Sequence, residues 1–466
     1  MDPEADGRRR SDRAQIVHRF DVVIDEDLIR AAIEHLARHD AGRVLAAVAR
    51  RFGDLDLADD AVQEALIEAA TRWPTDGIPT NPAGWLHQVA RRKAIDTLRR
   101  DGSARRRLRS SAPELDASRD EDGSMSGDGE VATSGGRVMI TDHGFDPGDE
   151  RLRLVLLCCH PALDLDAQVA LTLRLVGGLT TEEIAEAFLA PTPTIAQRIT
   201  RAKKKIRAAA IPMHLPTGLD GADGLSARLG FVHAALYLVF NEGYLSRSGA
   251  TGVQRVDLCD EAIRLTELLA RLDDSDPETL GLLALMRFVH ARRHGRVVGD
   301  QLVLLDDQDR TSWKLDEIRT GNDDLRRAFE QRRPGRYQLQ AAIASYHSNA
   351  RTADETDWPR IVALYDQLVA LDPTPVVGLN RAVAVAMADG PDAGLRALDA
   401  LADGRGDRDR LDDFHLAHST RGVLLARTGR HGEAIESFER ALELVRNPAE
   451  RELLERRLAE ARRSTS

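Results

Sequence analysis

The chain has 466 residues, 65 Lys and Arg against 76 Asp and Glu, and a net charge of −11; 42% of its residues are apolar and 4% are aromatic. The apolar residues are mostly Ala, Leu and Val, which predicts an all-α protein, and the length predicts about three or four domains. The chain has no apolar run of about 18 residues, no apolar stretch near its N-terminus and only three cysteines, so we expect a cytoplasmic protein without membrane span, secretory signal, disulfide framework, metal or other cofactor.

The charge is unevenly distributed along the chain. Residues 1–110 carry +1, residues 111–150 carry −9, residues 151–211 carry +4 and the remainder carries −7. The acidic segment is rich in Gly and Ser and has almost no periodic apolar residues, so we expect a flexible linker there. Nucleic acid would be attracted by the local basic clusters and not by the whole molecule.

The first block begins with helices. Apolar residues recur at helical spacing over residues 25–51 and again over residues 56–70. The polar face of the second stretch consists of four side chains: Asp59, Asp60, Gln63 and Glu64. Composition alone favours a solvated face whose acids complement the helix dipole, and a binding surface is the alternative.

A turn-rich segment, residues 73–82, leads into a predicted basic helix over residues 83–100. Opposite its apolar side lie an aromatic, an amide and several cations: Trp85, Gln88, Arg91, Arg92, Lys93 and Arg99. Cations beside an exposed aromatic suit phosphate contact and base stacking. A plain basic surface is an equally good interpretation of this pattern alone.

The second block predicts a helix-turn-helix. One or two helices over residues 151–175 precede a short helix that Thr180 or Thr181 would cap, a break at residues 189–193 and a basic helix over residues 194–207. The last helix would enter the major groove, with its polar and basic side chains on DNA: Thr194, Gln197, Arg198, Thr200, Arg201, Lys203, Lys204 and Lys205. A basic amphipathic surface helix is the alternative.

Together these blocks resemble an extracytoplasmic-function sigma factor of bacterial RNA polymerase. Residues 56–70 resemble sigma region 2.2, residues 73–100 resemble regions 2.3 and 2.4, and residues 154–207 resemble region 4. The resemblance implies that the polar face of residues 59–64 binds the β′ clamp helices and that the β flap is a second polymerase contact. It also implies that residues 73–82 capture a flipped base, that the basic helix holds the −10 promoter element, and that the helix-turn-helix reads the −35 element.

The acidic linker stands where other sigma factors have a sigma-3 domain, and this absence is typical of the group. The segment is longer and more acidic than the resemblance leads us to expect. Mimicry of nucleic acid in the RNA channel is one interpretation. A disordered, solvated chain is the other, and we favour it.

Three later segments resemble the subgroup of these factors with a long C-terminal extension that contains tetratricopeptide repeats (TPRs): residues 236–244, 308–313 and 357–365. Near the end of the chain, small and large residues follow TPR spacing: Gly422, Leu425, Gly429, Ala434, Phe438 and Ala441. Stacked repeats leave a concave groove, so an unidentified protein or peptide ligand is expected there.

Six domain segments follow from these patterns. They are sigma region 2 at 1–109 with a short disordered N-terminus, the acidic linker at 110–150, region 4 at 151–211, a second linker at 212–224, a helical extension at 225–335 and TPR-like repeats at 336–466. The histidines show no metal-ligand spacing, and no nucleophile stands with a base, so we expect no enzymatic activity.

The leading hypothesis is therefore a promoter-specificity subunit of RNA polymerase whose C-terminal half regulates the sigma half in cis. The alternative is a TPR interaction scaffold whose sigma-like half no longer binds polymerase. Binding to the β′ subunit discriminates between these two hypotheses.

Overall fold

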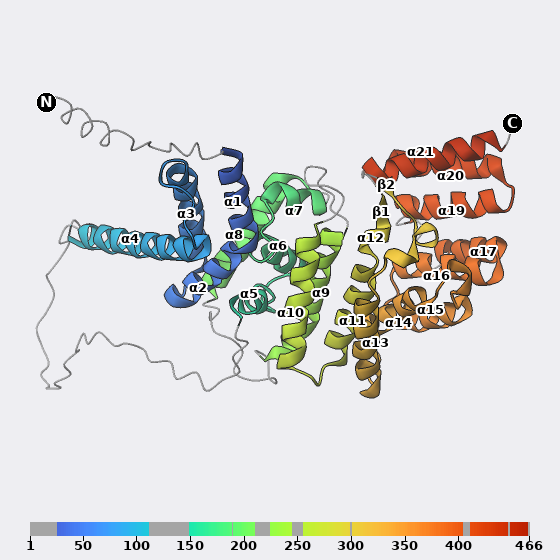
Figure 1. Ribbon diagram of the computed structural model, residues 1–466, viewed down its shortest axis with the longest axis horizontal. Helices are drawn as coiled ribbons and strands as arrows, with labels where there is room; N and C mark the ends of the chain where they lie inside the picture. Colours follow the sequence, from blue (N-terminus) through green and yellow to red (C-terminus); the bar gives the residue numbers. More distant parts are fainter. Residues whose placement is uncertain are drawn as a thin grey trace, which may run out of the picture. The chain divides into compact units, whose positions relative to one another are not determined.

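The computed structural model describes residues 26–110, 149–188, 190–209, 224–244, 255–298, 301–403, 411–445 and 448–464. The N-terminal segment 1–25, the acidic linker from 111 to 148 and nearly all of the second linker lie outside these ranges. Within them the fold is helical except for one pair of two-residue strands, so the predicted all-α class is confirmed. The chain divides into two compact units, residues 1–121 and 122–466 (Figure 1).

The described residues of the first unit form four helices: α1 (Glu26–His39), α2 (Ala41–Phe52), α3 (Leu55–Asp76) and α4 (Pro82–Ser110). Asp54 caps α3 by accepting a 3.0 Å hydrogen bond from the Leu57 amide. Helices α1, α2 and α4 all pack on α3, which contributes alanines and other apolar side chains to the core. Because small side chains allow close helix approach, α3 can be covered by three neighbours.

Helix α3 extends further than the sequence predicts. Residues 73–76, expected as the start of a turn-rich loop, form its last turn, although Pro74 lies within it. Trp73 is only 1% exposed, and its ring meets that of Trp85 edge-on at 5.5 Å. Burial of this large ring outweighs the helix-breaking tendency of proline, and only residues 77–81 remain as a connecting loop.

The second unit begins with α5 (Glu150–Cys158), α6 (Leu165–Leu175), α7 (Thr181–Ala187) and α8 (Thr192–Ala208). Side chains cap the first three: Asp149, Asp164 and Thr180 each accept hydrogen bonds from first-turn amides. At α7 the predicted cap is confirmed as a capping box, in which Thr180 Oγ1 accepts from the Glu183 amide at 3.1 Å and Glu183 accepts from the Thr180 amide at 2.7 Å. These caps fix where α5, α6 and α7 start, whereas α8 starts after Pro191 without a side-chain cap.

The next helices are α9 (Leu225–Tyr244), α10 (Val256–Leu272), α11 (Pro277–Ala291), α12 (Arg293–Arg296), α13 (Leu315–Glu330) and α14 (Arg336–Asn349). Strands β1 (Val297–Val298) and β2 (Gln301–Leu302) pair antiparallel. Three single-turn 3₁₀ helices, η1 (Leu305–Asp307), η2 (Arg310–Ser312) and η3 (Ala353–Glu355), lie in the connections. Helix α11 forms the centre of this part, because α9, α10, α13 and α14 all pack on it.

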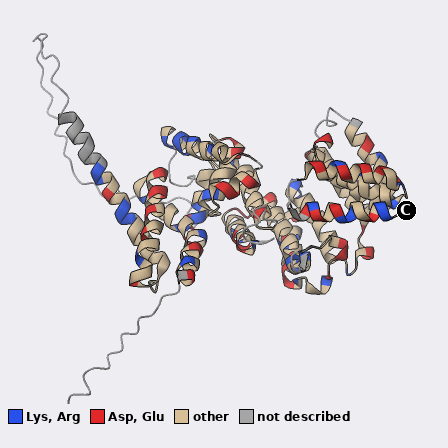
Figure 2. Cartoon of the chain, turned by 90° about the horizontal axis from the view of Figure 1, so that it is seen from above, with Lys and Arg blue, Asp and Glu red and all other residues tan. Residues whose placement is uncertain are grey.

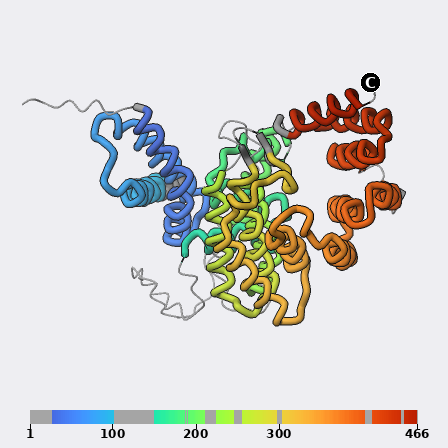
Figure 3. Tube along the Cα trace, turned by 45° about the vertical axis from the view of Figure 1, so that its right-hand side comes forward, coloured from blue at the N-terminus to red at the C-terminus, as the bar shows by residue number. Residues whose placement is uncertain are grey.

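The remaining helices lie side by side in chain order, as the orange-to-red part of Figure 3 shows: α15 (Trp358–Leu371), α16 (Pro375–Asp389), α17 (Pro391–Asp403), α19 (His415–Arg427), α20 (His431–Leu444) and α21 (Pro448–Arg463). At the predicted repeat, a Cβ on Gly422 would lie 2.7 Å from the Phe438 ring, so glycine permits the close contact of α19 with α20. Ala434, Phe438 and Ala441 are buried, as TPR spacing requires.

Candidate nucleic-acid interface

The polar face of α3 is smaller than expected. Asp60, Gln63 and Glu64 are exposed, but Asp59 is only 8% exposed and does not belong to this surface. Asp59 lies one turn after buried Leu55 and three residues before buried Val62, at the edge of the apolar stripe, where the neighbouring helices cover it. The expected four-residue surface is therefore a surface of three.

Helix α4 presents the expected basic side. Gln88, Arg91, Arg92 and Arg99 are exposed, and Lys93 is half-buried. Trp85 is also half-buried, because its ring packs against Trp73. The contact with buried Trp73 fixes the Trp85 ring at the start of the basic helix.

Glu68, which the sequence analysis did not single out, connects α3 to this basic side. Its carboxylate lies 3.0 Å from Lys93 Nζ and accepts a 2.9 Å hydrogen bond from Arg92 Nη2. The hydrogen bond from Lys93, acting against burial and assisted by Arg72 and Arg92, lowers the pKa of Glu68. Glu68 therefore neutralises part of the positive charge of α4 within the unit. The sequence alone does not reveal this contact, because it depends on how α3 packs against α4.

Helix α8 shows the predicted division into two faces. Its apolar stripe, Ile195, Ile199, Ala202 and Ile206, is buried. On the other side, six of the eight candidate side chains are exposed: Thr194, Gln197, Thr200, Arg201, Lys204 and Lys205. Arg198 and Lys203 are half-buried. Figure 2 shows residues of both charge signs spread over the chain, whereas α8 contains basic residues and no Asp or Glu.

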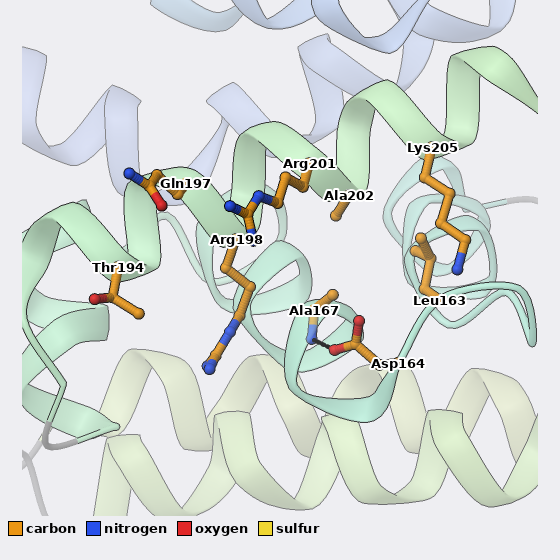
Figure 4. Close-up of a pocket in the computed structure, with 9 residues that line it drawn as sticks. All are labelled: Leu163, Asp164, Ala167, Thr194, Gln197, Arg198, Arg201, Ala202 and Lys205. Carbon is orange, nitrogen blue, oxygen red and sulfur yellow. Dashed lines mark hydrogen bonds between the residues drawn. The ribbon is translucent and has the colours of Figure 1, made fainter.

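Arg198 is held by two neighbours. Its Nη2 lies 3.2 Å from the carboxylate of Asp166 at the start of α6, and its guanidinium stacks 5.4 Å from the centre of the Phe188 ring. A cavity of about 250 Å³ lies between α8 and the loop that precedes α6. Figure 4 shows Gln197, Arg198 and Arg201 along α8, with Asp164 hydrogen-bonded to the Ala167 amide opposite them.

The part of the chain that contains α5 to α8 packs against the helices that follow it. Helix α9 lies on α6, and α10 contacts α5. Buried Arg228 of α9 donates a 3.1 Å hydrogen bond to the Leu156 carbonyl. Glu261 of α10 accepts from Arg151 at 2.7 Å, and Arg264 of α10 donates to Asp149 at 2.7 Å. No periodic pattern in the sequence indicates this interface.

Titratable clusters elsewhere do not form a metal site in the described part of the chain. Of the histidines examined in the sequence, His233 lies 2.7 Å from the Thr279 hydroxyl, and His290 lies 3.1 Å from Glu317. Burial raises the pKa of the Cys159 and Cys259 thiols to about 12, so they are apolar packing groups. None of the helices in the described ranges has both the length and the apolarity to span a bilayer.

Comparison with known families agrees with this geometry. Residues 36–104 match Sigma-70 region 2, and residues 153–206 match Sigma-70 region 4. The chain belongs to the sigma-70 family. It is an extracytoplasmic-function-like sigma factor with a TPR extension, since residues 415–448 match the tetratricopeptide repeat. Between these parts, residues 228–329 match a family of unknown function, DUF6596.

Two relatives show how far the similarity extends. The ECF RNA polymerase sigma factor SigK of Mycobacterium ulcerans (strain Agy99) is 28% identical over 174 residues, which cover 36% of this sigma factor and 80% of SigK. An uncharacterized protein of Rhizobium meliloti (strain 1021) is 42% identical over 409 residues, 88% of this chain and 90% of the relative. The second relative therefore shares the extension as well as the sigma regions.

Proposed function

We propose that this sigma factor binds the core of RNA polymerase and directs it to promoters with defined −35 and −10 elements. The observation that carries the proposal is the presence, in one chain, of two separate basic helices, α4 and α8, within matched sigma regions 2 and 4. Two helices that bind the same DNA duplex select a promoter by the sequence of each element and by the spacing between the elements. The chain performs no catalysis in this role and works in the cytoplasm.

In region 4, α8 enters the major groove. Gln197 and Thr200 face the base edges, while Arg198 and Arg201 contact guanine or phosphate. Lys203, Lys204 and Lys205 follow on the same helix and hold the DNA backbone.

In region 2, α4 holds the −10 element, with Trp85 positioned for base stacking and Arg91 and Arg99 for phosphate contact. Arg92 and Lys93 share their charge with Glu68, so we assign them a weaker contribution. Asp60, Gln63 and Glu64 form the contact with the β′ clamp helices, and region 4 provides the contact with the β flap.

The extension regulates region 4 in cis. The supporting observation is the packing of α9 and α10 on α6 and α5, together with the polar contacts of Arg228, Glu261 and Arg264 at α5. This interface couples movement of the extension to the DNA-reading helices. A protein or peptide bound in the TPR groove would act through this interface. The six domain segments given above, with boundaries at 110, 151, 212, 225 and 336, are the corresponding proposal for the organisation of the chain.

Reconstituted transcription tests promoter reading. Core polymerase with this chain is compared with core and the Arg198→Ala/Arg201→Ala variant, on promoter DNA with intact or scrambled −35 sequence. We expect the variant to lose the advantage of the intact −35 element. A control variant, Arg326→Ala/Arg381→Ala, removes two arginines from helices outside region 4 and should retain it. Equal −35 dependence in both variants would overturn the assignment of α8.

A further inference from the structure

Three arginines of the extension lie near one another, and none of them forms an ion pair with an acid of the described ranges. Arg292 directly follows α11, Arg296 ends α12 and Arg310 begins η2. Arg292 is only 9% exposed. The side chains of Arg292 and Arg296 have no hydrogen bond or ion pair with any residue in the described ranges, and Arg310 Nη1 binds only the backbone carbonyls of His347 and Ala350, both at 2.8 Å.

Aromatic rings hold the three guanidinium groups. Arg292 and Arg310 lie 5.9 and 4.6 Å from the centre of the same ring, that of Trp313, and Arg296 lies 3.9 Å from the centre of the Tyr244 ring. Gly295 packs directly on this turn, because a Cβ there would lie 3.0 Å from Trp313 Nε1. Tyr244 lies in segment 236–244, and Arg310 and Trp313 lie in segment 308–313. These are two of the three segments that resemble sigma factors with a C-terminal extension.

Several buried nitrogens of this cluster lack a hydrogen-bond partner in the described part of the chain: Arg292 Nε, Arg296 Nε, Arg310 Nη2, Trp313 Nε1 and His347 Nδ1. Burial, together with Arg292 and Arg310, lowers the pKa of His347 to about 4, so this imidazole is neutral at pH 7. Asp306 and Glu355 interact with Arg310 through long-range electrostatic attraction and form no ion pair with it. Glu355 forms its ion pair with Arg351. Arginine does not lose its proton in proteins, and a buried, unpaired cation is costly.

We propose that this cluster, Arg292, Arg296 and Arg310 with Trp313 and Tyr244, is a binding site for a small tetrahedral oxyanion of the phosphate type. Guanidinium groups recognise such anions through paired, charge-assisted hydrogen bonds. The anion is either free phosphate or the phosphate group of a small ester. The site is independent of promoter recognition, and it gives the extension a ligand of its own.

Calorimetric titration of the full-length chain tests the site, in oxyanion-free buffer with ionic strength held constant by chloride. The probes are inorganic phosphate and glycerol 3-phosphate. Binding of phosphate alone identifies a free-anion site, and tighter binding of the ester identifies an esterified ligand. Arg296→Gln should weaken the affinity by roughly tenfold or more, because one charge-assisted contact is lost. Arg326→Gln, at an exposed arginine paired with Asp323 and Glu330, should leave it unchanged.

Denaturant unfolding of Arg292→Met provides a second measurement. Wild-type chain should unfold at higher urea concentration when phosphate is present, and this gain should be absent in Arg292→Met. Two results would overturn the proposal: no heat and no stabilisation with either probe, or the same phosphate affinity in Arg296→Gln and Arg326→Gln.

Discussion

Arg228 of α9 donates its 3.1 Å hydrogen bond to the carbonyl oxygen of Leu156, 72 residues earlier in the chain. The guanidinium is buried, and so is Leu156 in α5. The bond therefore joins the extension to region 4 inside a shared core, and the extension belongs to the same compact unit as α8.

Replacement of Arg228 by Met should destabilise the second unit by about 1–3 kcal/mol, because the Leu156 carbonyl loses a charged donor and stays buried. Urea unfolding followed by circular dichroism measures the change. Arg326→Met, at an exposed position on α13, is the matched control. Equal midpoints for the two variants would show that the bond contributes nothing.

On the proposed function, Asp166 competes with DNA for Arg198, since the two side chains form a 3.2 Å ion pair. Exposed pairs of this kind are worth at most about 1 kcal/mol, so Asp166→Asn should raise promoter affinity of the reconstituted complex by roughly two- to fivefold. Filter binding or fluorescence anisotropy measures it. Asp323→Asn breaks a more exposed pair with Arg326 on α13, outside region 4, and should have no effect. A lower affinity in Asp166→Asn would contradict the role given to Arg198.

Helix positions and the helix-turn-helix followed from the sequence because they depend on local periodicity and caps. The predicted helix over residues 56–70 lies within α3, and the predicted basic helix over residues 194–207 lies within α8. Thr180 was one of two candidate caps, and it is the cap observed.

Other features depend on contacts between helices, which periodicity does not report. Asp59 is buried by the neighbours of α3, Trp73 continues α3 because its ring fills the core, and Glu68 neutralises part of α4 from the facing helix. The Arg292 cluster joins residues from three segments, at 244, 292–296 and 310–313, so no single stretch of sequence could reveal it.

Gly422 tests the TPR packing. Gly422→Ala adds a methyl group 2.7 Å from the Phe438 ring, and such overpacking should cost about 1–3 kcal/mol. Gly432→Ala, in α20 with open space around the added methyl, should be neutral or slightly stabilising. Thermal unfolding of both variants makes the comparison. A stable Gly422→Ala would mean that α19 and α20 are not in close contact.

His347 makes stability depend on pH. Its folded-state pKa of about 4 lies below the unfolded value of 6.5, so the unfolded chain binds the extra proton between these values and stability falls as the pH drops from 6.5 to 4. The loss is on the order of 3 kcal/mol and should be absent in His347→Gln. Urea unfolding at pH 7 and pH 4 measures it, with His418→Gln as the control. The prediction would be refuted if the free energy of unfolding changed with pH by the same amount in wild type and in His347→Gln.

Sequencing of transcripts from a library of randomised DNA tests the central claim most directly. Core polymerase reconstituted with the full chain should start transcription on templates that share two short motifs at fixed spacing, and Arg198→Ala/Arg201→Ala should erase the upstream motif alone. Start sites that share no motif, or that match those of core polymerase by itself, would contradict promoter recognition by α4 and α8.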